Sequence, residues 1–271
     1  MAQTDVELLT QARNGSAAAI DELLARHERQ VYRFGLRMCG SEEDARDVLQ
    51  ETLLAAFKAL PEFRGEAALS TWLYQIARSY CIKARRRNVG EPAETVSLDH
   101  AEVHALKADA DGPDSQAHAK EIGAVLQAAI QVLPAIHREA LVLRDVEGLS
   151  AEDAAKVLGI EVGALKSRLH RARNELREHV AALLGSAQPL GAPAPCPELA
   201  QELSAYVGAE LDQATCARIE EHLTRCPRCT AACDTLKRTV SLCRQIPGDE
   251  VPPAVRRAVR QALLQVTGAP A

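Results

Sequence analysis

The residues best suited to chemistry in this 271-residue chain are soft metal ligands near its C-terminal end. His222, Cys226 and Cys229 follow the pattern H-x3-C-x2-C. Imidazole nitrogen and thiolate sulfur are preferred ligands of zinc, which takes four ligands in a closed tetrahedral structural site. The trio therefore predicts a zinc site that needs one further soft ligand. Candidates for that ligand are Cys196, Cys216 and Cys233.

The elements around this trio would bring its members together. His222 and Cys226 are four residues apart, which places them on one face of a helix. Pro227 can begin a second helix, so Cys229 would lie near an N-terminus whose dipole favours the thiolate. One zinc leaves cysteines to spare, which permits a second soft metal ion or a redox pair. The possible additional ligands are Cys216, Cys233 and Cys243. The alternative is that these cysteines are buried apolar residues.

A second informative stretch, LSAEDAAKVLGIEVGALKSRLHRARNELRE, predicts two helices joined by a tight turn. Ser150 and Asp153 form a capping box, Gly159 can close the first helix, and the second begins at about Val162. One side of the second helix is apolar. Its other side carries Lys166, Ser167, Arg168, His170, Arg171 and Arg173. The pattern is typical of a DNA-binding helix-turn-helix, although a helical hairpin with a solvated basic face has the same form.

A third stretch, TWLYQIARSYCIKARRR at residues 71–87, combines aromatic and basic residues. Cations bind phosphates and aromatic faces can stack on exposed bases, so the stretch fits a nucleic-acid surface. The residues concerned are Trp72, Tyr74 and Tyr80 with Arg78, Lys83, Arg85 and Arg86. Alternatively, Trp72 and Tyr80 are core residues and the arginines keep the helix end soluble.

Three acidic residues, Asp44, Asp47 and Glu51, form a ridge on a predicted helix earlier in the chain. Their spacing of three and four residues places them on one helix face. Such a ridge is compatible with a solvated surface or with a protein partner.

Composition limits the class of protein. The net charge of −5 restricts nucleic-acid contacts to local patches, and 47% hydrophobic residues support folded cores. A signal peptide and long apolar runs are missing, so we expect a cytoplasmic protein without membrane insertion, in which structural disulfides are disfavoured. We do not expect an enzyme, because the sequence offers no nucleophile with a paired base, phosphate-binding glycine loop or open catalytic metal site.

Helical periodicity with polar interruptions predicts an all-α chain of several small domains. The expected organisation is a helical domain at 1–90, a flexible linker at 91–119, a helix-turn-helix domain at 120–185, a linker at 186–195, a zinc-binding domain at 196–246, and a C-terminal helix and tail at 247–271.

Two of the helical stretches and the helix-turn-helix together resemble a bacterial sigma factor of the extracytoplasmic-function (ECF) group. DARDVLQETLLAAFKAL resembles the segment that grips the clamp helices of RNA polymerase, and STWLYQIARSYCIKARRR resembles the segment that melts and reads the promoter −10 element. LPAIHREALVLRDVEGLSAEDAAKVLGIEVGALKSRLHRARNEL resembles sigma domain 4, the reader of the −35 element. The resemblance implies two helical sigma domains, domains 2 and 4, that bring core polymerase to promoter DNA and direct transcription initiation.

The resemblance also implies roles for individual residues. The acidic residues Asp47 and Glu51 become polymerase contacts. The −35 contacts become Lys166, Ser167, Arg168, His170 and Arg171. The contacts to the −10 region become Trp72, Arg78, Lys83, Arg85 and Arg86, with Phe63 and Arg64 in the loop, residues 63–66, that captures a flipped base.

The cysteine-rich segment, with its ELSAYVGAEL run, resembles the zinc-binding anti-sigma fold. That resemblance implies Cys196 as the fourth zinc ligand and suggests that the tail regulates the sigma factor in cis by sensing metal or redox state. Two alternatives stay open. The tail could be a structural zinc module that docks a regulator protein, or the helix-turn-helix could belong to a polymerase-independent repressor.

Overall fold

The structure is a computed structural model that describes residues 3–65, 67–88, 114–183, 195–246 and 250–267. Within these ranges the chain is helical and contains no strand, as expected for an all-α protein. It divides into two compact units, residues 1–95 with 248–271 and residues 96–247. None of the described helices has both the length and the apolar character needed to cross a bilayer.

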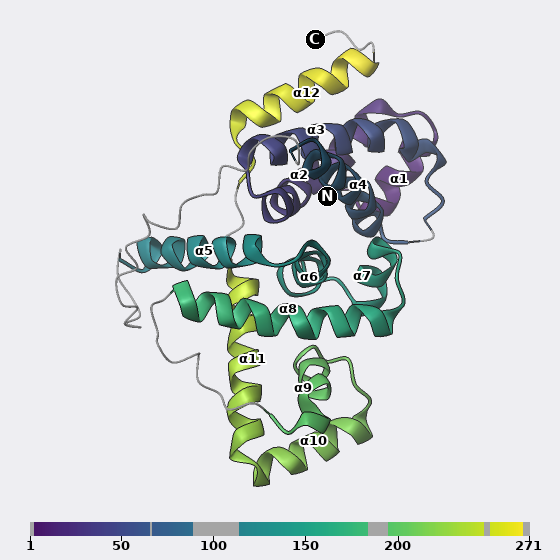
Figure 1. The fold of residues 1–271 in the computed structure, drawn as a ribbon. Coiled ribbons are helices and arrows are strands. Elements are labelled where there is room, and N and C mark those ends of the chain that lie inside the picture. The colour runs from purple at the N-terminus through teal and green to yellow at the C-terminus, as the bar shows by residue number, and fades with distance from the viewer. Residues whose placement is uncertain (1–2, 66, 89–113, 184–194, 247–249, 268–271) are drawn as a thin grey trace. The chain divides into compact units, whose positions relative to one another are not determined.

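Unit 1 is built on four consecutive helices and a short 3-10 turn (Figure 1). These elements are α1 (Asp5–Arg13), α2 (Ala17–Cys39), α3 (Glu42–Ala59), η1 (Leu60–Glu62) and α4 (Leu69–Asn88). A capping box of Thr4 and Glu7 begins α1, and Gly40 ends α2 in the left-handed conformation at φ 84°. The core between α2, α3 and α4 is made of side chains such as Leu23, Leu49 and Leu73, each fully buried.

The C-terminal helix α12 (Pro253–Thr267) belongs to unit 1 although it is remote in sequence. It packs on α3 and inserts Val259 and Leu263 against the domain. Arg256 pairs with Glu28 of α2. The helix is therefore an integral part of this unit.

Unit 2 contains the helix-turn-helix and the cysteine-rich segment. The first part comprises α5 (Asp114–Val132), α6 (Ala135–Leu141), the π-helical turn η3 (Val142–Val146), α7 (Ala151–Leu158) and α8 (Val162–Leu183). The Ser150 side chain accepts from the backbone N–H of Asp153, and Gly159 ends α7 at φ 65°. Both local signals read from the sequence therefore act as predicted.

The cysteine-rich segment follows with η4 (Pro197–Leu199), α9 (Ala200–Val207), α10 (Gln213–Arg225) and α11 (Pro227–Gln245). Pro227 is the first residue of α11, as the sequence predicts. A small core of Leu199, Leu203, Ile219 and Leu236 joins the helices. The long helix α11 extends beyond this core to contact α8 and η3 (Figure 1).

The two expected linkers differ from the structure or lie outside the described residues. Helix α5 begins at Asp114, inside the linker expected at 91–119, so that boundary was wrong. The start of α5 was not predicted because its first turns lack a continuous apolar stripe. The remainder of that linker and nearly all of the linker expected at 186–195 lie outside the described residues.

Candidate metal centre and nucleic-acid interface

Four soft ligands converge at one end of the cysteine-rich segment. The ligand atoms of Cys196, His222, Cys226 and Cys229 all lie within 4.8 Å of one another. Cys196 precedes η4, His222 is in the last turn of α10, Cys226 is the non-helical residue between α10 and α11, and Cys229 is in the first turn of α11. Cys226 leaves the helix with φ −120° and ψ 96°, so it does not share a helical face with His222 as we expected.

The chemistry of these four residues fits zinc. The Nε2 atom of His222 is buried and has no hydrogen-bond partner among the described residues, as a metal ligand would leave it. The backbone N–H of Cys229 lowers the pKa of Cys226 to about 7, against the opposing effect of burial. Contact with Cys229 raises the pKa of Cys196 to about 11. One thiol of the group therefore loses its proton more easily than a free cysteine and another keeps its proton more strongly, and a divalent cation would stabilise the thiolates together.

The other three cysteines of the segment lie apart from this cluster. Cys216 is half-buried, with its thiol 3.9 Å from the carbonyl oxygen of Leu211. Cys233 is buried in the segment core, one turn beyond Cys229. Cys243 is buried near Asp145 and Arg173, and this burial raises the pKa of its thiol. The structure therefore brings together the four predicted zinc ligands and none of the additional three.

The basic side of α8 is only partly exposed. Arg171 is exposed, whereas four neighbours are half-buried: Lys166, Ser167, Arg168 and His170. Burial, together with the charges of Arg173, Arg171 and Arg177, lowers the pKa of His170. His170 is therefore neutral near pH 7 unless an anion approaches it.

Arg173 corrects our expectation, because it is not on the basic surface of α8. Its side chain is 1% exposed, and its Nε and Nη2 atoms each donate to a carboxylate oxygen of Asp145 at 2.7 Å. Its Nη1 atom donates to the carbonyl oxygen and to the hydroxyl oxygen of Ser204, at 2.6 and 2.8 Å. Arg173 thus links η3 to α9. Helical spacing places it beside the basic residues, and the buried partners come from distant parts of the sequence.

A second contact between the cysteine-rich segment and the helix-turn-helix centres on Glu210. The Nε atom of Arg144 donates to the Glu210 carboxylate at 2.9 Å, and its Nη2 donates to the carbonyl oxygen of Gly208 at 2.9 Å. Lys166 donates to the carbonyl oxygen of Glu210 at 3.1 Å. The carboxylate of Glu210 is 5% exposed. Sequence reasoning missed this residue, since only the anti-sigma-like run ELSAYVGAEL points to it.

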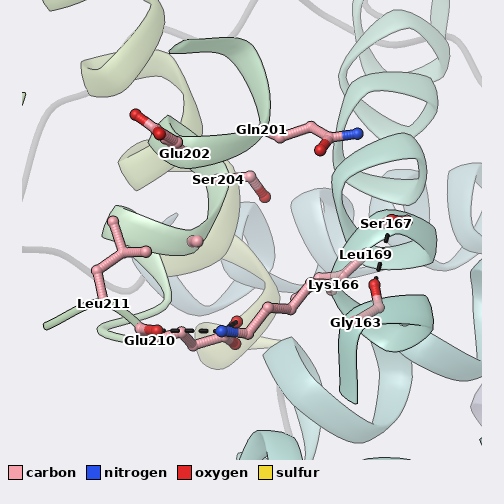
Figure 2. A pocket seen from close by; sticks show the side chains of 10 residues that line it. Gly163, Lys166, Ser167, Leu169, Gln201, Glu202, Ser204, Glu210 and Leu211 are labelled. Carbon is pink, nitrogen blue, oxygen red and sulfur yellow. Dashed lines mark hydrogen bonds and ion pairs between the residues drawn. The ribbon is translucent and has the colours of Figure 1, made fainter. Parts of the chain in front are cut away.

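Figure 2 shows the resulting interface, in which Lys166 reaches from α8 to Glu210. A pocket of about 270 Å³ lies between Gly163, Lys166 and Ser167 on α8 and Gln201, Glu202 and Leu211 on the other side. Two of the predicted −35 contacts, Lys166 and Ser167, therefore line this pocket and are half-buried beside the cysteine-rich segment.

The aromatic and basic residues of α4 divide between core and surface. Tyr74 is 1% exposed and packs on Phe34 at 5.2 Å between ring centroids, so its predicted place on a nucleic-acid surface was wrong. Trp72 is half-buried and contacts Phe63 at 4.9 Å between centroids. The Lys83 ammonium lies 4.7 Å from the centroid of the half-buried Tyr80 ring. Lys83 and Arg86 are exposed, whereas Arg78 and Arg85 are half-buried.

The loop before α4 is held in place by α1. Arg13 donates from Nε and Nη2 to the carbonyl oxygen of Phe63, at 3.1 and 2.6 Å. Phe63 is half-buried beside Trp72, and Arg64 is exposed. The predicted loop extended to residue 66, which lies outside the described residues. A surface that pairs aromatic rings with cations is thus available next to α4.

The acidic ridge lies on the solvent side of α3. The Asp47 side chain is 47% exposed and 3.7 Å from Arg46, and Glu51 is exposed. The opposite face of α3, with Val48, Leu49 and Thr52, is buried. The two carboxylates are therefore accessible to a protein partner.

Sequence models of three families match the chain. They are "Sigma-70 region 2" over residues 23–90, "Sigma-70, region 4" over 124–176 and "Putative zinc-finger" over 196–230.

Curated relatives carry consistent names. The RNA polymerase sigma-H factor of Pseudomonas aeruginosa is 35% identical over 193 residues, which cover 68% of this chain and 98% of the relative. The ECF RNA polymerase sigma-E factor of Haemophilus influenzae is 31% identical, with 67% and 97% covered. The ECF sigma factor SigE of Mycolicibacterium smegmatis is 35% identical, with 59% of this chain and 61% of SigE covered.

Similar solved structures include CnrH in complex with the cytosolic domain of CnrY, at 27% identity and a TM-score of 0.45, with 66% of this chain and 96% of CnrH covered. Another is the sigma factor RpoE of Bartonella quintana in complex with the anti-sigma factor NepR, at 26% identity and a TM-score of 0.44, with 62% and 97% covered. The sequence relationships, which span both sigma regions and nearly the whole of two relatives, show that the chain belongs to the ECF group of RNA polymerase sigma factors.

Proposed function

We propose that this sigma factor is held inactive in cis by its own zinc-binding C-terminal segment, which occupies part of the −35 reading helix. The observation that carries the proposal is the buried contact of Glu210 with Arg144 and Lys166. A basic side chain held by a carboxylate and a carbonyl oxygen is not available to a DNA phosphate. The segment therefore competes with promoter DNA for the same cation.

The proposed DNA-binding residues are on two helices and in one loop, and each of them is exposed or half-buried. On α8, Lys166, Ser167, Arg168, His170 and Arg171 are the proposed contacts to the −35 element. Around α4, the proposed −10 contacts are Trp72, Arg78, Lys83, Arg85 and Arg86, with Phe63 and Arg64 in the preceding loop. Phosphate contacts from these cations would be modest in number, so promoter affinity would depend on polymerase holding both domains.

The cysteine-rich segment connects the proposed metal site to the inhibitory contact at Glu210. The proposed zinc ligands tie the start of η4 to the junction of α10 and α11, and α9 with the Glu210 turn lies between these points. A metal ion there would order the turn that presents Glu210 to α8. We propose that metal binding or oxidation at these thiols changes how strongly the cysteine-rich segment binds α8. This makes the tail a sensor for soft metals or oxidants in the compartment of the polymerase, the cytoplasm.

The proposal is tested by transcription in vitro with core polymerase and a pooled library of promoter fragments, with the initiated RNAs sequenced. A chain truncated after residue 185 should give more initiation than the full chain. Glu210→Gln removes the buried charge at nearly constant size. The change should weaken the inhibitory contact between the cysteine-rich segment and α8 by about 1.4 kcal/mol or more, which raises the fraction of molecules with a free α8 roughly tenfold. Glu198→Gln, at an exposed position of η4, is the matched control and should behave as the full chain.

Other results would separate the alternatives. Loss of initiation on truncation would contradict inhibition and make the tail a required activating domain. Equal activity of all four proteins would contradict cis-regulation and favour a structural zinc module that docks a separate regulator protein.

The proposed polymerase contact on α3 gives a second prediction. Glu51→Lys should weaken binding to core polymerase by about tenfold, or ~1.4 kcal/mol, because it reverses the charge of a carboxylate proposed to contact the polymerase. Binding is measured by fluorescence titration of labelled protein with core enzyme. Glu62→Lys, an equivalent change at an exposed position of unit 1, is the control. Equal weakening in both variants would make the effect one of net charge and remove Asp47 and Glu51 from the interface.

A further inference from the structure

Two cysteines outside the metal centre lie in direct contact within unit 1. Cys39 is the last residue of α2, and Cys81 is in the middle of α4. Their sulfur atoms are 3.3 Å apart, with the Cys39 thiol donating toward the Cys81 sulfur. Forty-two positions separate the two residues, so the packing of α2 on α4 alone creates the contact. Both cysteines are in apolar helical stretches, which predicts core packing for each but not that the two meet.

The two thiols differ in accessibility in the way a stepwise oxidation requires. Cys39 is half-buried and is the last residue of α2. Cys81 is 0% exposed, so an oxidant in solution has less access to it than to Cys39. The first thiol can therefore react with an external oxidant, while the second is positioned to attack the product before another molecule of oxidant arrives.

The local backbone permits the small movement that a bond requires. A disulfide holds its sulfur atoms at about 2.05 Å, so the two must approach by about 1.2 Å from their present separation. Cys39 is at the end of its helix, and Gly40 follows in the left-handed conformation at φ 84°. The last turn of a helix lacks part of its hydrogen bonding and adjusts more easily than its centre.

We propose that Cys39 and Cys81 form a redox pair that hydroperoxides oxidise to a disulfide. The Cys39 thiolate attacks a peroxide oxygen, the O–O bond breaks, and Cys39 becomes a sulfenic acid as hydroxide or alkoxide leaves. The Cys81 sulfur then attacks the Cys39 sulfur, the S–O bond breaks, and water leaves. With hydrogen peroxide the sum is two thiols and one peroxide giving one disulfide and two water molecules, a two-electron oxidation of the pair.

This bond would connect the end of α2 to α4, the helix that carries the proposed −10 contacts. Cross-linking two helices restricts the unfolded chain and opposes their separation. Oxidation therefore locks the helical packing of unit 1. The pair is independent of the metal centre, because its residues are in unit 1 and the proposed zinc ligands are in unit 2.

The sequence allows a direct test in the full-length protein. Trypsin releases Cys39 in MCGSEEDAR, residues 38–46, and Cys81 in SYCIK, residues 79–83, so each peptide carries one cysteine. The native protein is treated with one equivalent of hydrogen peroxide, alkylated and digested without reduction. The expected product is a cross-linked pair of these peptides, lighter than their sum by two hydrogen atoms and separated again by dithiothreitol.

Thermal unfolding provides the second readout. The melting temperature of the oxidised protein should rise by several degrees and return on reduction, since a disulfide that closes a loop of this length is strongly stabilising. Cys39→Ser and Cys81→Ala, made separately, should each abolish both the cross-link and the shift. Cys39→Ser alters a half-buried helix end, which keeps one control independent of any packing loss at Cys81.

Three results would overturn the proposal. The first is full alkylation of both peptides under conditions that oxidise other cysteines of the chain. The second is conversion of Cys39 to sulfinic acid while Cys81 stays reduced, which would show that the buried thiol does not resolve the intermediate. The third is a cross-link that forms only in guanidinium, since it would then owe nothing to native packing.

Discussion

Replacing Cys226 by serine is expected to remove zinc from the protein and to unfold the cysteine-rich segment around the site. Binding of structural zinc contributes roughly 10–16 kcal/mol in small domains, and a neutral hydroxyl is a poor substitute for thiolate. Without the metal, the small core of Leu199, Leu203, Ile219 and Leu236 is too limited to hold η4, α9 and α10 together. Zinc content should fall from one per chain to less than about a tenth.

The measurement is metal analysis of the purified protein, combined with limited proteolysis of residues 196–246. Cys233→Ala is the matched control, because Cys233 is buried one turn beyond Cys229 yet lies outside the ligand cluster. The control should keep its zinc and its resistance to protease. Stoichiometric zinc in Cys226→Ser with loss of zinc in Cys233→Ala would instead assign Cys233 as a ligand.

The same pair of variants separates metal sensing from structure. If the tail senses metal through its zinc ligands, Cys226→Ser should initiate transcription equally at all concentrations of zinc, copper or cadmium. A zinc-replete Cys233→Ala with an altered metal response would assign sensing to the additional cysteines. Identical responses from both variants and the native chain would contradict metal sensing by the tail.

Arg173→Met is expected to destabilise unit 2 by about 3–5 kcal/mol, which is a large part of the stability of an average domain. The substitution leaves the Asp145 carboxylate buried without its counter-charge, and the carbonyl oxygen of Ser204 loses one of two donors, keeping only the backbone N–H of Gly208. Arg171→Ala, two residues away on the same helix but exposed, should change stability by less than about 0.5 kcal/mol.

Amide hydrogen exchange of α6 and α8 in the full chain measures this difference, because it reports local opening energies in a protein with several units. A double replacement, Arg173→Met with Asp145→Leu, should recover most of the loss, since a buried ion pair can be exchanged for apolar contacts at little net cost. Equal protection in Arg173→Met and Arg171→Ala would mean that the buried pair contributes nothing to the fold.

Arg173→Met also tests the attachment of the tail. Because Arg173 donates to Ser204 of α9, its loss should expose the cysteine-rich segment to protease even with zinc bound. Cys226→Ser should expose the segment by unfolding it. Retention of zinc distinguishes the two routes.

Local signals explain how much of the fold was predictable from the sequence. The Ser150 cap and the Gly159 turn act within a few residues, so they specify the helix-turn-helix wherever the rest of the chain goes. The H-x3-C-x2-C trio is also positioned by local signals. Pro227 and the end of α10 bring His222, Cys226 and Cys229 together within eight residues. Cys196 is 26 residues before His222, and only the resemblance to a known fold singled it out from the other candidate cysteines.

Side-chain environments on a single helix were less predictable. Periodicity places Arg173 near the basic residues of α8, yet it is buried because Asp145 and Ser204 supply charge and acceptors across 28 and 31 positions. Tyr74 is in a stretch whose aromatic and basic residues are typical of a nucleic-acid surface, yet its ring packs on Phe34 of α2. A helix face becomes a surface only when no other element packs against it.

The sequence by itself determined the family, the helical composition, and the residue types of the metal centre and the basic helices. These depend on local capping, spacing and composition, which act over one or two turns. Only the tertiary structure decided that Glu210 holds Lys166, that Arg173 is buried, and that Cys39 meets Cys81. Each of these contacts joins residues 28 to 44 positions apart, and their meeting depends on how whole helices pack.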